Sequence, residues 1–167
     1  MKRLILMRHA KSDLADAQTS DHDRPLSARG RDNATALGQW LADKGLHPDA
    51  VLCSSAKRAS ETLEKLSLEN GVKVDFTRDL YLADAESILA KLQDATGETV
   101  LVVGHNPGIA AMAEMIVKTP PNGDGISHYP TGATLAVTFD VDDWSDVHWH
   151  MGKMSQIVVP RDLPAPQ

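Results

Sequence analysis

Short apolar runs alternate with longer amphipathic stretches along most of this chain, and this alternation limits the possible folds more than any other feature. The most uniformly aliphatic run, Thr-Val-Leu-Val-Val, occupies residues 99–103. A strand without a polar face has to be covered on both sides, as in the centre of a parallel sheet. We therefore expect an α/β fold of three layers, in which a mainly parallel sheet carries helices on both faces.

Six runs are expected to form strands, at residues 2–7, 50–53, 72–76, 99–103, 133–141 and 146–151. The last two are expected to pair as a hairpin or at an edge of the sheet. Apolar residues at helical spacing predict helices between the other strands. Ser27 and Asp84 are suitable N-caps for two of these helices, and the helix after the second strand is expected to run to Asn70. Asn106 is expected to cap the next helix, with Pro107 as its first residue.

The length and composition are those of one globular domain that spans residues 1–167, with a loose, proline-rich tail from about residue 160. A formal charge of -6 argues against nucleic acid as a partner, because a polyphosphate backbone binds to a basic face. A single cysteine excludes a disulfide within the chain. Only four apolar residues separate Arg3 from Arg8, too few for a signal peptide or a membrane span, so we expect a cytoplasmic protein without a membrane partner.

Cationic and imidazole side chains follow three of the predicted strands. Arg8 and His9 end the first strand, Arg58 lies just beyond the second, and His105 follows the fourth. The carboxyl ends of parallel strands meet at one edge of a sheet, and ligands bind there. We therefore expect these four side chains to converge on one site. Three further residues are expected to contact the substrate there, namely Asn106, Ser54 and Lys11.

This set of residue types is suited to phosphoryl transfer. A guanidinium can donate two parallel hydrogen bonds to phosphoryl oxygens and offset their charge. A neutral imidazole is nucleophilic near pH 7 and can accept the phosphoryl group, which divides one difficult displacement into two easier steps. Positioning and electrostatic stabilisation supply most of the catalysis in such reactions. The expected chemistry needs no metal and no cofactor.

Four segments, in this order, resemble the signatures of the histidine phosphatase superfamily, and within it the SixA-type phosphohistidine phosphatases. They are LILMRHA at 4–10, DRPLSARG at 23–30, SSAKRASET at 54–62 and VVGHNPG at 102–108. Ala10 stands where the family commonly has glycine. The resemblance implies that His9 is the nucleophile and that Arg8, Arg58 and His105 bind the phosphoryl group. The short chain, without the large insertion of the mutase-like members, favours the SixA-type branch.

The leaving group of the substrate determines whether the reaction needs a general acid. An alkoxide leaving group needs a general acid, whereas imidazole leaves readily once it is protonated. Asp79, Asp84 and Glu86 are candidate acids, but no recognisable motif fixes any of them. A weak or absent acid suits a phosphoramidate, so the expected partner is a phosphorylated protein of the histidine phosphotransfer type.

Two other functions remain open at this stage. One is a phosphomonoesterase that acts on a small phosphorylated metabolite, with one of the three carboxylates as its acid. The other is a pseudoenzyme that only binds phosphorylated partners. The two histidines, His9 and His105, disfavour the pseudoenzyme, because arginines alone suffice to bind phosphate.

The sequence gives weaker support to two other candidate sites, a catalytic cysteine and a metal site formed by histidines. Cys53 precedes Arg58 as in cysteine-dependent phosphatases, but the spacing is one residue too short, and we expect a buried core thiol. His148 and His150 share one face of a predicted strand, but no third metal ligand has suitable spacing, so a solvated strand face is expected.

Two long polar connections, residues 11–26 and 119–132, interrupt the regular pattern. Connections of this length are usually functional or disordered. They carry His22 and His128, which are candidates for approaching the site. The first also holds four aspartates, for which a solvated acidic loop is a better interpretation than a metal cage: Asp13, Asp16, Asp21 and Asp23.

Overall fold

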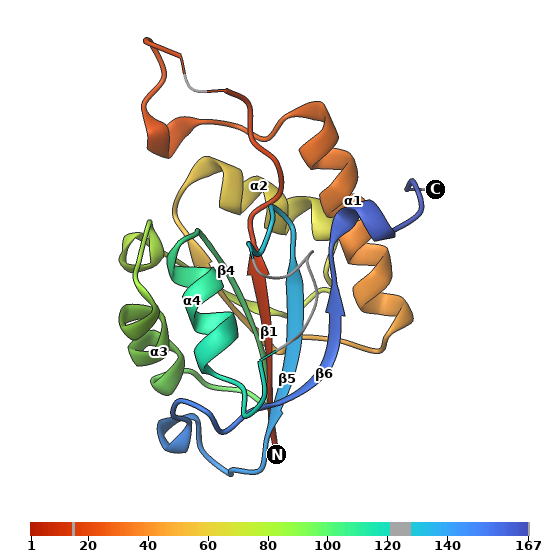
Figure 1. The fold of residues 1–167 in the computed structure, drawn as a ribbon. Coiled ribbons are helices and arrows are strands. Elements are labelled where there is room, and N and C mark those ends of the chain that lie inside the picture. The colour runs from red at the N-terminus through yellow and green to blue at the C-terminus, as the bar shows by residue number, and fades with distance from the viewer. Residues whose placement is uncertain (15, 121–127, 167) are drawn as a thin grey trace.

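A computed structural model describes residues 1–14, 16–120 and 128–166, and shows one six-stranded sheet in the order β3-β2-β4-β1-β5-β6 (Figure 1). The strands are β1 (Lys2–Arg8), β2 (Ala50–Ser54), β3 (Lys73–Thr77), β4 (Thr99–Gly104), β5 (Thr134–Phe139) and β6 (Lys153–Val158). The first four are mutually parallel, while β5 runs antiparallel to both β1 and β6. The expectation of a mainly parallel sheet is confirmed.

Helices cover both faces of this sheet. They are α1 (Ala28–Asp43), α2 (Lys57–Leu66), α3 (Ala85–Gln93) and α4 (Gly108–Met115). Alternate residues of β1 divide the core: Leu4 and Leu6 belong to the cluster with α3 and α4, whereas Ile5 and Met7 belong to the cluster with α1 and α2. All four are fully buried, so the three-layer prediction is confirmed and the central strands are apolar on both faces.

Two helices begin at their predicted caps, whereas the end of α2 and the start of α4 differ from the prediction. The side chain of Ser27 accepts a hydrogen bond from the Gly30 amide, and that of Asp84 accepts one from the Ser87 amide. The prediction that α2 continues to Asn70 is wrong, because Ser67 adopts a left-handed conformation that ends the helix after Leu66.

Helix α4 begins at Gly108 rather than at the predicted Pro107, which takes the N-cap position. The Asn106 side chain still contributes to the helix start, since its Oδ1 accepts a hydrogen bond from the Ala110 amide. The apolar residues predicted to face the core from this helix are all buried: Ile109, Met112, Ala113 and Ile116.

The last predicted strand, 146–151, is placed wrongly. Trp144–Asp146 forms a 3-10 helix instead, and the edge strand that pairs with β5 is Lys153–Val158. Buried Trp144 and Val147 pack against the core, and Gln93 of α3 donates a hydrogen bond to the Val147 carbonyl. These contacts hold the segment beside α3 and out of the sheet, so His148 and His150 are exposed in the connection before β6 and do not lie on a strand face.

The carboxyl-terminal segment forms a 3-10 helix at Pro160–Asp162 that lies beside α1 (Figure 1). Leu163 packs against the core. Residues 121–127, within the predicted 119–132 connection, lie outside the described residues. Within the described part of the chain, no helix is long and apolar enough to cross a membrane.

Candidate active site

The ends of β1, β2 and β4 meet at one edge of the sheet, as the parallel topology requires. The His9 amide donates to the Gly104 carbonyl at 3.0 Å, which couples the end of β1 to that of β4. Arg8, His9, Arg58 and His105 line one open cavity of about 380 Å³. The other described residues on its wall are Lys11, Ser12, Asp21, Arg24, Leu82, Asn106 and Thr131. The four predicted residues therefore do come together.

The orientation of His9 determines which of its nitrogens is free. Nδ1 lies 2.7 Å from the carbonyl oxygen of Ala10. A carbonyl oxygen can only accept, so Nδ1 carries the ring proton and the lone pair is on Nε2. Burial is the main cause that lowers the pKa of His9 to about 4; the Arg58 and Arg8 charges also lower it, while the hydrogen bond to Ala10 acts in the opposite direction. The imidazole is thus neutral near pH 7, with an unprotonated nitrogen available.

His105 stands beside His9, with ring centroids 5.1 Å apart. Burial lowers its pKa to about 3, helped by His9 and Arg58. Its Nε2 lies 2.7 Å from the Ser54 hydroxyl oxygen, which itself accepts from the Ala56 amide. The Ser54 hydroxyl can donate to Nε2 while it accepts from Ala56, an arrangement compatible with a ring proton on Nδ1 of His105. Nδ1 is buried and has no partner among the described residues.

Arg58 is almost completely buried, at 2% exposure, and Asp21 binds its guanidinium. Nη1 donates to the Asp21 carbonyl at 2.7 Å and Nη2 to the Asp21 carboxylate at 3.1 Å. The same carboxylate accepts from Arg24 Nε at 3.1 Å and from the Tyr81 hydroxyl. The Tyr81 hydrogen bond is the main cause that lowers the pKa of Asp21 to about 2, with Arg58 and Arg24 adding to it. Asp21 is therefore an anion inside a cationic cavity.

Arg8 reaches the cavity from β1 and is half-buried. Its Nη1 donates to the Tyr129 carbonyl at 3.3 Å. Burial, together with the Arg58 charge, lowers its pKa below the usual value. The nearby Asn106 amide donates to the carbonyls of His128 and Tyr129, so Asn106 joins β4 to the segment that leads into β5.

The structure separates the remaining predicted residues. Lys11 and Asn106 line the cavity, whereas Ser54 lies behind His105 and is not on the wall formed by the described residues. The candidate acids also lie off that wall: Asp79 pairs with Lys91, Asp84 caps α3 and Glu86 is exposed.

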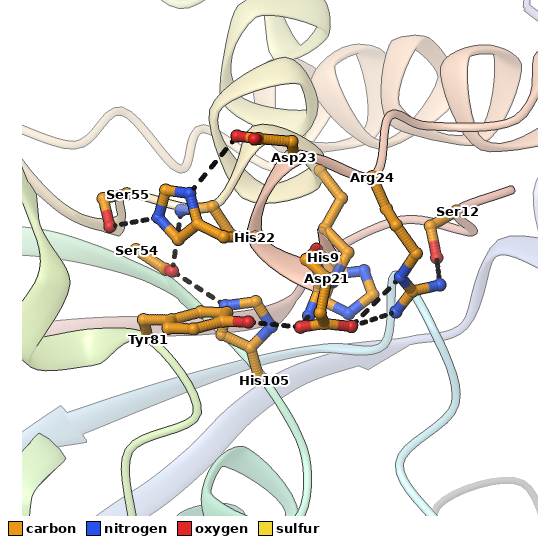
Figure 2. Close-up of polar contacts among 12 residues, drawn as sticks. His9, Ser12, Asp21, His22, Asp23, Arg24, Ser54, Ser55, Tyr81 and His105 are labelled. Carbon is orange, nitrogen blue, oxygen red and sulfur yellow. Dashed lines mark hydrogen bonds and ion pairs between the residues drawn. The ribbon is translucent and has the colours of Figure 1, made fainter. Parts of the chain in front are cut away.

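Two cavity contacts carry little sequence signal. The sequence places Asp21 in a predicted solvated acidic loop, and no motif or spacing marks Tyr81. Tyr81 packs edge-on against His105 and His22, with centroids 5.5 and 4.8 Å away, and His22 lies 2.8 Å from the Ser55 hydroxyl (Figure 2). Arg24, in contrast, stands in the DRPLSARG segment and could have been singled out there.

Known proteins resemble this chain in sequence and in fold. The sequence model of the histidine phosphatase superfamily (branch 1) matches residues 4–81. A solved structure from Nakamurella multipartitia, assigned as the phosphohistidine phosphatase SixA, is 32% identical with a TM-score of 0.84, over 95% of this chain and 96% of that one. The chain belongs to the histidine phosphatase superfamily. Phosphohistidine phosphatase SixA of Escherichia coli K12 is 29% identical over 89% of this chain and 92% of its own length. A SixA structure complexed with tungstate is 27% identical, with a TM-score of 0.77 over 96% of this chain and 98% of that one.

This phosphatase is thus similar to SixA over nearly its whole length. Its one cysteine, Cys53, is buried, and burial raises the pKa of the thiol to about 12. A thiol with such a pKa stays protonated near pH 7 and is a poor nucleophile. Within residues 1–14, 16–120 and 128–166, no group of three or more His, Cys, Asp or Glu side chains is close enough to hold a metal ion.

Proposed function

We propose that this phosphatase removes the phosphoryl group from phosphohistidine on a protein, through a covalent intermediate on His9. The observation that carries the proposal is the state of His9. Its Nδ1 proton is engaged by the Ala10 carbonyl and its pKa is about 4, so Nε2 is unprotonated inside a cavity lined by guanidiniums. Such a nitrogen can attack phosphorus while the surrounding cations offset the charge of the phosphoryl oxygens.

The proposed reaction has two steps. First, the lone pair on Nε2 of His9 forms a bond to phosphorus while the bond from phosphorus to the substrate imidazole breaks, and that imidazole nitrogen gains a proton. Water then attacks phosphorus, the bond to His9 breaks, and inorganic phosphate leaves. Arg8 and Arg58 bind the phosphoryl oxygens, and Nδ1 of His105 donates to one of them. No step calls on a metal ion or a cofactor.

The positions and charge states of the carboxylates favour a phosphoramidate as the substrate. The three candidate acids lie off the described cavity wall, and the carboxylate on the wall, Asp21, is ionised above a pKa of about 2. An ionised carboxylate cannot give a proton to an alkoxide, whereas an imidazole leaving group makes little demand on an acid. The similarity to SixA, which is named a phosphohistidine phosphatase, and the tungstate in one SixA structure support the same substrate class and an oxyanion site.

Rapid-quench trapping tests the intermediate. The wild type, mixed with a phosphodonor labelled with radioactive phosphate, should give an acid-labile protein label within one turnover, and His9→Asn should give none. Cys53→Ala is the matched control and should keep the label, because the Cys53 thiol is buried and protonated. A label that survives in His9→Asn, or no label in the wild type, would exclude His9 as the nucleophile.

A side-by-side comparison tests the substrate. We expect kcat/KM for a histidine phosphotransfer domain phosphorylated on histidine to exceed that for sugar phosphates. A clear preference for the phosphate esters would instead establish a phosphomonoesterase that acts on small metabolites. Tight binding of the phosphodomain without turnover would identify a binding protein.

A further inference from the structure

A second cavity, of about 230 Å³, lies next to the catalytic cavity and shares part of its wall. Lys11 and Thr131 line both cavities. The second cavity, called the basic groove below, is lined by Lys11, Arg29, Asn33, Pro130, Thr131, Val159, Pro160 and Arg161. A substrate group in the groove would therefore be continuous with a phosphoryl group held at His9.

The basic groove carries three cations and no carboxylate among its lining residues. Ion pairs with acidic side chains engage other basic residues, such as Arg24, Arg58 and Lys91. In the described part of the chain, none of the cations of the groove has a carboxylate oxygen within ion-pair distance. Unpaired cations gathered in a concave site on a chain of formal charge -6 favour an external anion.

Backbone contacts hold the groove at a fixed position relative to His9. The Lys11 carbonyl accepts hydrogen bonds from the amide and the hydroxyl of Ser27 at the start of α1. The Gly132 amide donates to the carbonyls of Arg8 and His9, and a Cβ at Gly132 would approach the Pro160 ring closely. The end of β1, the start of α1 and the 3-10 helix at Pro160–Asp162 are thus joined around the groove.

An exposed leucine on the catalytic cavity argues for a macromolecular occupant. Leu82 lines that cavity, is 53% exposed, and has a left-handed backbone with φ of +52°. A leucine in this conformation is strained, and such strain is typical of functional surfaces. The catalytic cavity therefore offers an apolar contact as well as Lys11, the cation that it shares with the groove, a combination that suits a protein surface.

We infer that the basic groove binds an acidic side chain of the phosphorylated protein, placed beside its phosphohistidine. This inference rests on the proposed protein substrate. The carboxylate is held by Arg29 and Arg161, which contribute to recognition of the protein and take no part in the chemical step. Small phosphoramidates do not extend into the groove and gain nothing from it.

The variant Arg29→Gln/Arg161→Gln tests the inference. The substrates are a histidine phosphotransfer domain with acidic residues beside its phosphohistidine, and free phosphohistidine. We expect kcat/KM for the domain to fall about tenfold, mainly through KM, with a smaller loss at high salt. The value for free phosphohistidine should not change.

Two control variants distinguish an effect of the groove from a general effect of charge. Lys73→Gln/Lys153→Gln removes the same two positive charges from exposed positions on the edge strands β3 and β6 and should leave both substrates unaffected. Arg29→Lys/Arg161→Lys keeps the charge and should retain most of the activity on the domain. Equal losses of kcat/KM for both substrates, or no loss for the domain, would overturn the inference that the basic groove binds an acidic side chain of the substrate protein. A wild type that hydrolyses free phosphohistidine but not the domain would overturn the proposed function and this inference together.

Discussion

Two neutral histidines beside arginines make the active site sensitive to acid at the scale of single residues. His9 has a pKa of about 4 and His105 one of about 3, against an ordinary value near 6.5. Between pH 6.5 and 4 the unfolded chain binds protons at both positions that the folded protein does not bind. The free energy of unfolding therefore falls as the pH drops through this window. The stability that depends on the two neutral imidazoles is fully present above pH 6.5.

The lowered pKa of His9 leads to a prediction for the variant His9→Asn. Each histidine contributes a slope of up to about 1.4 kcal/mol per pH unit between its two pKa values. Urea denaturation of the wild type and the variant from pH 7 to pH 4.5 should show that the variant loses less stability on acidification. His148→Gln, at an exposed histidine, should follow the wild type. Parallel curves for wild type and His9→Asn would contradict the lowered pKa.

Asp21 provides a second prediction at this scale. Its carboxylate occupies donors of Arg58, which binds the phosphoryl group in the proposed reaction, and of Arg24, which also lines the cavity. Asp21→Asn should therefore bind inorganic phosphate about fivefold more tightly, which corresponds to about 1 kcal/mol for a partly exposed ion pair. Competitive inhibition by phosphate measures this, with Asp23→Asn as a control at the neighbouring exposed carboxylate. Weaker inhibition would show that Asp21 mainly positions Arg58.

The sequence could reveal His9 and His105 because each follows a strand, and parallel strands end at the same edge of a sheet. Asp21 and Tyr81 could not be found in this way. Asp21 begins a 3-10 helix at Asp21–Asp23, and Tyr81, 60 residues later, follows one at Arg78–Leu80, so their contact depends on how these two segments pack. Neither periodicity nor strand position contains that information, and a carboxylate among other aspartates looks like solvated surface.

At the scale of elements, α2 supports the segment that follows the catalytic strand. The buried Thr62 hydroxyl accepts a hydrogen bond from the Ala10 amide at 3.0 Å and donates to the Arg58 carbonyl at 2.7 Å. Both Ala10 and Thr62 are fully buried. The contact thus joins the residue after His9 to the helix that carries Arg58.

Thr62→Val tests this contact, since valine has a similar shape but leaves the Ala10 amide without a partner. We expect the free energy of unfolding to fall by about 1 to 3 kcal/mol, the usual cost of a buried unsatisfied donor. Thr62→Ser keeps the hydroxyl and should retain the hydrogen bond, losing only the packing of one methyl group. Urea denaturation compares the two variants, and a serine variant less stable than the valine variant would contradict the argument.

The errors at this scale arose where tertiary contacts override local pattern. Residues 146–151 alternate in polarity like a strand, but burial of Trp144 and Val147 against the core draws the segment out of the sheet. The central strands were easier to predict because their aliphatic runs have no exposed face and fit few environments other than the middle of the sheet.

At the scale of the whole molecule, the site couples ligand binding to the stability of the fold. His9 follows the central strand β1, His105 follows its neighbour β4, and Arg58 lies on α2, which packs on the sheet. These residues come together only when the parallel part of the sheet and its covering helices are formed. An oxyanion in the cavity therefore binds the folded protein and not the unfolded chain.

Inorganic phosphate should accordingly raise the melting temperature. At 100 times its dissociation constant, a ligand specific for the folded state adds about 2.7 kcal/mol, which for a chain of this size corresponds to about 5 to 10 °C. Differential scanning calorimetry measures the shift, with chloride at equal ionic strength as the control for general salt effects. Arg58→Gln should lose most of the shift, because it removes a buried cation from the cavity. An equal shift in that variant would place the bound phosphate elsewhere on the molecule.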